Sequence, residues 1–483
     1  MKRIKLVIGT FLILATGLMP SCTKDFSEFN TDPNRAAAAL PHNLLAPAIY
    51  DVVSRNNTRA LRITNELMQV HVPLSDGDQI HRYIIRPTES DYMWNNWYLQ
   101  LTNFKDMYAG AERINHKSYM AISLICQVWV SSLITDMFGD VPYFDANLGR
   151  ENIYKPKFDA QKDIYADMYA KLEEANTLLA ANQAIDDSQK SSDPLYNGDI
   201  SKWRKFGNSL YLRLLMRASG VAESGAVDKI REMIDVNPAN YPIFTSNADA
   251  AILKYTANDP LMSPFATYRD LDFSTGNSLS EFFINTLNNW NDPRRAVWAT
   301  KYGGEYIGVP SGFPIGQVPA PRSRYPSSLK TEPLLGNIIN YAEVQFILAE
   351  AALKGYIAGN PKTYYDAGVE NAITMWGIAL PTGYLSSATI IYSPLATPEA
   401  NLEKIITQKY FTFFFTDFQQ WYEYRRTGYP ALPKGDALQN DGILPTRFTY
   451  PVYVQSLNQA NYRAAVAAMG GSDDMKTKVW WNK

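Results

Sequence analysis

Apolar residues recur at spacings of three and four along most of this chain, whereas strict alternation of apolar and polar residues is scarce. The first spacing gathers apolar side chains on one face of an α-helix, while alternation would indicate a half-buried strand. The sequence therefore predicts a mostly α-helical protein with few short strands. The predicted helices span Asn43–His71, Tyr92–Ile114, Tyr119–Phe138, Ala160–Ala181, Ile200–Ala218, Val227–Asp235, Leu279–Asn289, Ile339–Leu353, Tyr364–Trp376 and Glu399–Tyr424.

Five long segments between these helices have little periodicity and many turn-forming residues. They are Pro73–Asp91, Asp186–Gly198, Pro238–Gly276, Tyr302–Leu335 and Gly377–Pro398. Loops of this length inside a compact domain are usually functional or disordered. Their aromatic residues favour ordered loops.

Two stretches predict how the helices pack. Alanine and glycine recur through Asn337–Ala372, as is typical of tetratricopeptide-type helix pairs with a period of about 34 residues, although no clean repeat can be aligned. Nine aromatic residues in Tyr410–Tyr424 would cover nearly all sides of a helix. A helix that is apolar all round is buried, so we expect this one in the core.

The N-terminus has the layout of a secretory signal. Lys2, Arg3 and Lys5 precede the apolar run Leu6–Met19, and Cys22 follows a small residue. The run has 14 residues, fewer than the ~20 that a membrane-spanning helix needs. Cleavage before Cys22, with lipid attached to its thiol, is therefore favoured over a retained membrane helix.

A lipoprotein signal at the N-terminus divides the chain into three parts. We expect residues 1–21 to be a signal peptide, residues 22–35 to be a lipidated tether that begins at Cys22, and residues 36–483 to form one helical domain. Acidic residues soon after Cys22 resemble signals that direct lipoproteins to the outer leaflet of the outer membrane, with an ordinary polar tether as the alternative. Cys126 lies in an apolar helix and is expected to be a small buried hydrophobe.

Charge and composition narrow the classes of ligand. The formal net charge is −2, and no basic stripe offers the concentrated Lys and Arg that phosphate binding needs, so no nucleic-acid partner is expected. The chain has 31 Tyr, 21 Phe and 10 Trp, more than a minimal core requires. Such a surplus suits stacking on flat ligand faces, although most of these rings must pack internally.

Catalytic and metal-binding motifs are missing from the sequence. None of the four histidines belongs to an HExxH pair or a Cys/His cluster, and no GxSxG elbow, Walker loop or GxGxxG fingerprint occurs. No enzyme activity and no cofactor are expected. A glycosidase pair depends on a carboxyl separation of about 5–10 Å, so a surface hydrolase stays open. Asp76 with Asp78, or Asp270 with Asp272, could bind calcium, but solvated turns are the favoured interpretation.

Nine strings, spread in order over the mature chain, make a more specific pattern than any one of them. They are FNTDPN at Phe29–Asn34, DMFGDVPYFDA at Asp136–Ala146, YNGDISKWRKFGNSLYLRLLMRAS at Tyr196–Ser219, NDPRR at Asn291–Arg295, YAEVQFILAEAALKG at Tyr341–Gly355, QKYF at Gln408–Phe411, YRRTGYP at Tyr424–Pro430, PTRFTYP at Pro445–Pro451 and TKVWWNK at Thr477–Lys483. In these strings the chain resembles the SusD/RagB family of nutrient-binding outer-membrane lipoproteins, in its SusD-like branch.

The resemblance implies a fold and a function. The fold would be tetratricopeptide-like helix pairs that support irregular loops. The protein would be anchored by lipid in the outer membrane, facing the exterior, as the lid of a SusC-like TonB-dependent β-barrel transporter. It would capture an extracellular nutrient without covalent chemistry. A neutral glycan is preferred, a peptide is the runner-up, and a surface hydrolase or a scaffold without its own ligand are the alternatives.

The loops carry the candidate ligand residues, because a pyranose lays its C–H face on an exposed aromatic ring while its hydroxyls bond to Asp, Asn and Arg. No family string falls on these residues, so they rest on side-chain chemistry alone. His81 and Tyr83 lie in a polar run and are expected to be exposed, whereas Trp94 is favoured as part of the core. The candidates are Asp78, His81, Tyr83, Trp94, Tyr268, Asp272, Phe313, Arg322 and Tyr325.

Overall fold

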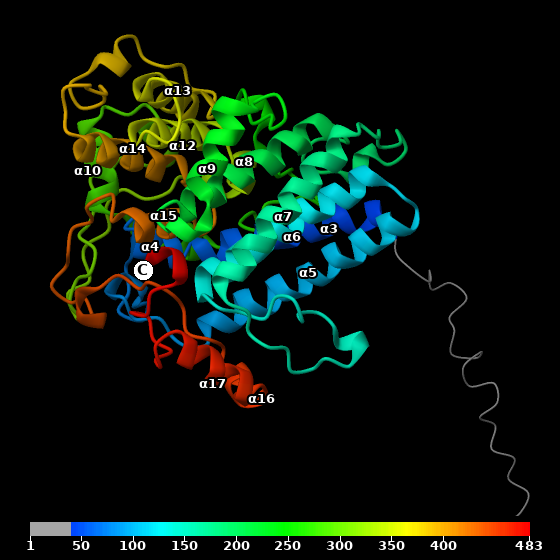
Figure 1. The fold of residues 1–483 in the computed structure, drawn as a ribbon. Coiled ribbons are helices and arrows are strands. Elements are labelled where there is room, and N and C mark those ends of the chain that lie inside the picture. The colour runs from blue at the N-terminus through cyan, green and yellow to red at the C-terminus, as the bar shows by residue number, and fades with distance from the viewer. Residues whose placement is uncertain (1–39) are drawn as a thin grey trace, which may run out of the picture. The chain divides into compact units, whose positions relative to one another are not determined.

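The computed structural model describes residues 40–483, which form one unit of mostly helical chain (Figure 1). The helices are α3 (Pro41–Ala60), α4 (Ile63–Leu67), α5 (Glu89–Arg113), α6 (Lys117–Phe138), α7 (Gln161–Ala180), α8 (Ile200–Ala218), α9 (Ala226–Arg231), α10 (Glu281–Asn289), α11 (Arg295–Trp298), α12 (Tyr341–Leu353), α13 (Pro361–Thr374), α14 (Pro398–Thr412), α15 (Gln419–Thr427), α16 (Val452–Leu457) and α17 (Gln459–Ala468). The predicted mostly α-helical fold is confirmed. The signal peptide at residues 1–21 and the tether at residues 22–35 with Cys22 lie outside the described residues and stay predictions.

Strands are few and short. In the part of the chain that the structure describes, β1 (His71–Pro73) pairs antiparallel with β3 (Asn277–Leu279), and β2 (Ala251–Ile252) pairs antiparallel with β4 (Asn337–Ile339). Each pair joins segments that are far apart in the sequence. The strands therefore fasten loops to one another and do not build a layer of their own.

Helix α6 forms the centre of the N-terminal half, between α5 and α7 (Figure 1). Every residue from Ala121 to Phe138 is buried, including Cys126 as predicted, and burial raises the pKa of the Cys126 thiol well above its ordinary value. Among residues 40–483, α6 is the one helix long and apolar enough to cross a membrane. Its complete burial identifies it as a core helix instead.

Successive helices pack as antiparallel neighbours, as the tetratricopeptide-like prediction requires. The pair α12 and α13 crosses so closely that a Cβ at Gly368 would lie 2.7 Å from the Phe346 ring. A side chain there would force the rigid ring to move, so the small residue is needed for this crossing. The small residues in this stretch thus have the role that the sequence suggested.

The aromatic stretch is buried as predicted, but the expectation of one helix over Glu399–Tyr424 is wrong. α14 ends at Thr412 and α15 starts at Gln419, with left-handed backbone at Phe415 (φ 58°) between them. The break lets neighbouring rings point apart: Phe414 stacks on Trp298 at 4.4 Å, while Phe415 packs against Phe265 at 5.8 Å. Core packing of bulky rings in several directions has overridden helical periodicity here.

The expected helix Asn43–His71 is likewise divided. α3 ends at Ala60, α4 occupies Ile63–Leu67, and His71 belongs to β1. The turn between α3 and α4 brings Arg62 alongside the loop that follows β1. This turn positions the polar cleft described next.

Candidate functional site

A polar cleft of about 330 Å³ lies where the turn between α3 and α4, the start of α5 and the β1–β3 pair meet. We call it the Arg62 cleft. It is lined by Thr58, Arg59, Leu61, Arg62, Glu66, His71, Asp78, Tyr92, Tyr268, Asp272 and Asn277. The β1–β3 register pairs Pro73 with Asn277, which places the loop after β1 beside the loop before β3.

The charged side chains of one wall are paired with one another. Arg62 donates from Nε to Asp78 Oδ2 at 2.6 Å and from Nη1 to Glu89 Oε1 at 2.9 Å, while Arg59 donates to Glu89 Oε2 at 3.4 Å. Burial opposes ionisation of Asp78, but the hydrogen bond and charge of Arg62 outweigh it together with hydrogen bonds from Glu66 and the Ile80 backbone, and the pKa of Asp78 is lowered. The same pairing raises the pKa of Arg62. The wall therefore carries charges that largely cancel.

The floor of the cleft is uncharged. Burial, with the nearby Asp78 carboxylate, raises the pKa of Glu66 well above its usual value and so favours its uncharged form. Burial lowers the pKa of His71 to about 3, so its imidazole is neutral. Tyr325 supports that ring from below: its hydroxyl accepts from Asn65 Nδ2 at 3.1 Å and lies 3.0 Å from His71 Nδ1. A neutral floor of donors and acceptors suits hydroxyl groups.

Two tyrosine rings flank the cleft. The guanidinium carbon of Arg59 lies 3.6 Å from the centroid of the Tyr92 ring, a cation–π contact that holds both side chains. Tyr268 is half-buried and packs edge-on against Phe265 at 5.5 Å. Asp272 is exposed and accepts from Arg269 at 2.7 Å. The cleft thus combines aromatic faces with exposed hydrogen-bonding groups.

The structure brings three predicted site residues together, because Asp78, Tyr268 and Asp272 all line the Arg62 cleft. Arg322 does not line it; the guanidinium of Arg322 lies over the Tyr302 ring, 4.7 Å from its centroid. Trp94 is buried, as favoured, and packs edge-on against Phe138 at 5.1 Å.

The expected exposure of His81 and Tyr83 is wrong, since both are buried. Their segment turns beneath the loop near Phe313: His81 Nδ1 accepts from Gly312 N–H at 3.1 Å, and the His81 and Phe313 rings lie 4.6 Å apart. Phe313 and Tyr325 are buried too. In this conformation none of these four rings can offer a face to a sugar. Tyr325 instead supports the floor through His71.

Sequence reasoning missed Arg59, Arg62 and Asn277, and it treated Tyr92 only as a helix start. Arg59 and Arg62 fell inside an expected continuous helix, where arginine usually marks a solvated face. The one available signal was the pair of arginines one turn apart, close to the acidic turn that contains Asp78. That spacing could have suggested an ion-pair network.

The acidic turns, for which calcium binding was the less favoured alternative, have other partners. Asp76 accepts from Gly316 N–H at 3.1 Å, and Asp78 is held by Arg62. Asp270 accepts from Lys330 at 3.2 Å, and Asp272 from Arg269. Across residues 40–483, no group of three or more His, Cys, Asp or Glu side chains is placed to hold a metal ion.

Comparisons with known proteins agree with this fold. A family model described as starch-binding and associating with the outer membrane matches residues 33–451. A chitin-binding protein of solved structure is 28% identical, with a TM-score of 0.78 over 91% of this chain and 99% of its own.

Two further solved structures show the same fold. A SusD homologue from Bacteroides fragilis is 24% identical (TM-score 0.78, 92% and 99% covered), and a chitin-binding SusD homologue from Flavobacterium johnsoniae is 23% identical (TM-score 0.79, 92% and 98% covered). No curated protein matches the chain.

Proposed function

The chain belongs to the SusD-like family, described as starch-binding and associating with the outer membrane, and from this premise we propose that it binds an extracellular glycan in the Arg62 cleft. The observation that carries the proposal is the combination of a neutral polar floor with balanced charges and two tyrosine rings in one cleft. A sugar ring needs an apolar face beneath it and hydrogen-bonding groups around it. The cleft offers both.

The size and charge of the cleft favour a short stretch of neutral glycan. Its volume of about 330 Å³ is at the lower end of ligand pockets, which span roughly 300–1,000 Å³. A few sugar units of a longer chain would therefore occupy it. Because Arg62 is already neutralised by Asp78 and Glu89, a ligand charge is not required. Two classes of neutral glycan are the first to test. The family description names starch, and the 28% identical relative is a chitin-binding protein.

The carboxyl groups of the cleft support binding without hydrolysis. Glu66 is only 1% exposed, and Asp78 is occupied by Arg62. A glycosidase needs two carboxyl groups that both reach the scissile bond. We expect incubation of the purified protein with starch and chitin oligosaccharides to leave them intact, as judged by chromatography. Release of shorter sugars would favour the hydrolase alternative.

Binding can be tested by calorimetric titration of the full chain, purified in detergent, with malto-oligosaccharides, chito-oligosaccharides and peptides. We expect saturable heat with one glycan class. Tyr268→Ala should weaken it by about tenfold or more, because a ring that anchors a ligand typically contributes over 1 kcal/mol. Tyr154→Ala is the matched control, since Tyr154 is an exposed ring outside the cleft. Equal affinity in both variants, or binding of peptides alone, would contradict the proposal.

The cellular setting is a second part of the proposal. The protein would be anchored in the outer membrane by lipid on Cys22, face the exterior, and act as the lid of a SusC-like TonB-dependent transporter. The family description of outer-membrane association supports this setting. Cys22→Ala should release the protein from the membrane fraction, and a tagged wild-type chain should co-purify a TonB-dependent barrel. A scaffold role would show the barrel without any glycan binding.

A further inference from the structure

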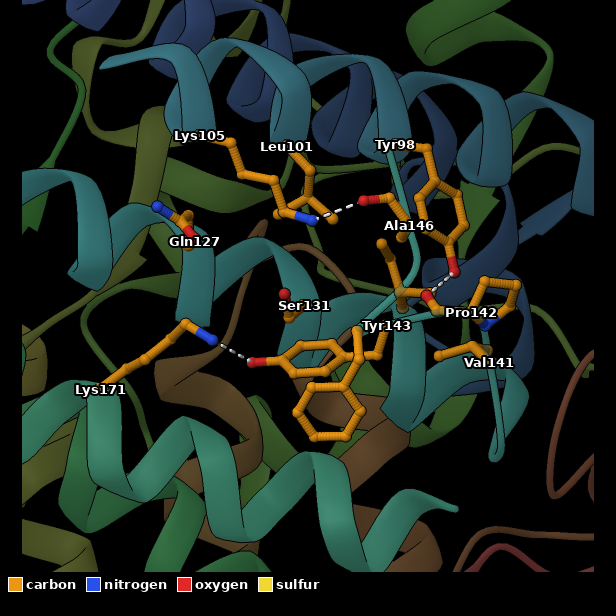
Figure 2. A pocket seen from close by; sticks show the side chains of 12 residues that line it. Tyr98, Leu101, Lys105, Gln127, Ser131, Val141, Pro142, Tyr143, Ala146 and Lys171 are labelled. Atoms are coloured by element: carbon orange, nitrogen blue, oxygen red, sulfur yellow. Dashed lines mark hydrogen bonds between the residues drawn. The ribbon is translucent and has the colours of Figure 1, made fainter. Parts of the chain in front are cut away.

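A second cavity, of about 110 Å³, lies between α5, α6, α7 and the loop of residues 139–147 (Figure 2). We call it the Lys105 cavity. It shares no lining residue with the Arg62 cleft. Lys105 enters it from α5, Gln127 and Ser131 from α6, and Lys171 from α7.

The two lysines of the cavity differ in their partners. Lys171 forms an ion pair with Asp167 and donates to the Tyr143 hydroxyl at 3.1 Å. Lys105 donates to the backbone carbonyl of Ala146 at 2.7 Å, and within residues 40–483 it pairs with no carboxylate. An ammonium group has three hydrogens, and only one of them is used here. Lys105 is therefore a half-buried cation with no carboxylate of residues 40–483 within ion-pair distance.

Ser131 adds a second unused donor. It is only 4% exposed, and its hydroxyl forms no hydrogen bond with any other residue between 40 and 483. Its oxygen is not one of the fully enclosed side-chain atoms that lack a partner among residues 40–483, so it is open to the cavity and free to donate there. Lys105 and Ser131 lie on adjacent walls of the same space in Figure 2. Together they offer a positive charge and a hydroxyl to one acceptor group.

The remaining walls limit the size and polarity of what can enter. Leu101, Ile134, Val141 and Phe144 form an apolar lining next to the polar groups. The volume of about 110 Å³ is somewhat smaller than an engineered cavity of about 150 Å³ that binds benzene. The space therefore suits about four to six non-hydrogen atoms, of which one end is anionic and the other apolar.

We propose that the Lys105 cavity binds the carboxylate of a small organic anion, with Lys105 and Ser131 donating to its oxygens and its carbon skeleton lying against Ile134 and Phe144. Two sources would supply this chemistry. One is a free short-chain carboxylate. The other is the carboxylate of an acidic sugar, whose ring would lie in the neighbouring hollow that Lys105, Gln127 and Lys171 also line, together with Tyr108.

Titration of Lys105 gives the site a pH dependence. Burial, with the positive charge of Lys171, lowers the pKa of Lys105 to about 8, so it is mostly protonated at pH 7. The charged or titratable groups near the cavity are Tyr98, Tyr108, Tyr143, Glu151, Asp167, Lys171 and Glu174. Anion binding should therefore weaken as the pH rises above 8.

The first test compares ligands on the unmodified protein, which avoids any effect of substitution on folding. The full chain in detergent is titrated with butyrate and with butyramide, its uncharged analogue of the same size, and in parallel with glucuronate and glucose. We expect saturable binding of butyrate, of glucuronate or of both, and affinity at least about tenfold lower for the neutral analogue. Butyrate alone identifies a free short acid, and glucuronate alone an acidic sugar. Equal binding of charged and neutral analogues, or binding of neither acid at millimolar concentration, would overturn the proposal.

The second test locates the binding. Lys105→Met keeps the length of the side chain and removes its charge, so the affinity for the bound acid should fall at least about tenfold. Lys162→Met removes a charge from an exposed site on α7 and should leave the affinity unchanged. An unchanged affinity in Lys105→Met, with both variants melting as the wild type does, would place the acid elsewhere.

Discussion

The Arg62 cleft and the Lys105 cavity are both polar, but their charges are balanced in different ways. In the cleft, Arg62 meets Asp78 and Glu89, and the buried groups of the floor are neutral. In the cavity, Lys105 has a backbone carbonyl as its one hydrogen-bond partner among residues 40–483. A neutral polyol can exchange hydrogen bonds with the first site without separating charges. The second site gains most from a ligand that brings the missing negative charge.

The same difference distinguishes charged residues that hold a loop in place from a charged residue that is available to a ligand. The Arg62–Asp78 pair is partly exposed, so its contribution to folding is small. Its main effect is geometric, because it fixes the loop after β1 against the turn between α3 and α4. Lys105, in contrast, lines its cavity and donates one hydrogen bond, to the backbone carbonyl of Ala146. Changes at the two sites should therefore act on different ligands.

The largest expected effect comes from reversing the charge in the cavity. Lys105→Glu replaces the attraction for a carboxylate by repulsion, so acid binding should fall about a hundredfold or more. Glycan binding in the cleft should stay within twofold, because the two sites share no residue. Calorimetric titration of one protein sample with both ligands measures this. Parallel loss of both activities would indicate a general defect in folding.

A pH series should separate the sites without any substitution. At pH 9, one unit above the Lys105 pKa of about 8, about a tenth of the lysine remains charged, so acid binding should weaken about tenfold. The cleft should bind glycan about equally from pH 6 to 9, because His71, with its pKa of about 3, is already neutral, Asp78 is already ionised, and burial opposes ionisation of Glu66. Titrations at each pH, with the acid and with the glycan, check both predictions. A glycan affinity that follows the same curve would contradict the assignment of distinct sites.

Asp78→Asn should give the Arg62 cleft a partly uncompensated positive charge, as the Lys105 cavity has. Removal of this carboxylate leaves Arg62 with only Glu89, which frees part of its positive charge. The cleft should then bind an acidic oligosaccharide about fivefold more tightly than the wild type does. Direct titration with uronate-containing oligosaccharides measures the gain. Asp186→Asn, at a carboxylate outside the cleft, serves as the control.

Salt should have the smallest effect. Raising the ionic strength from 0.05 to 0.5 M shortens the range of electrostatic attraction, so acid binding should weaken about threefold. Neutral glycan binding should not change. Titrations in both buffers, with sodium sulfate avoided as a competing anion, give the comparison. Salt-insensitive acid binding would indicate that apolar contacts, and not Lys105, hold the ligand.

Much of the fold could be predicted from periodicity, because α5, α6 and α8 carry long and regular apolar faces. Breaks inside helical patterns could not. No glycine or proline marks the turn at Arg62, and the left-handed Phe415 lies in a run of strong apolar residues. In both places tertiary packing decides the backbone, and a local pattern does not contain that information.

The candidate site was predictable only in part, for a related reason. Loop chemistry identified Asp78, Tyr268 and Asp272, but nothing local shows that residues about 190 positions apart share a cleft. Their meeting depends on the three-residue pairing of β1 and β3, which is too short for an alternating pattern to reveal. Lys105 likewise resembled a solvated helix residue. It is covered because the loop of residues 139–147 folds back on α5, where the Tyr98 hydroxyl donates to Pro142 O at 2.7 Å.

The β1–β3 pair has a consequence for engineering and for evolution. Its backbone hydrogen bonds join the start of the loop after β1 to the end of the loop before β3, and such bonds depend little on side-chain identity. The loops beyond it can therefore be lengthened or exchanged at a modest entropic cost that grows only with the logarithm of their length. The helix pairs below need not be repacked. Loops of a different sequence could therefore be joined at the β1–β3 pair, which would introduce new sugar specificities into an unchanged scaffold.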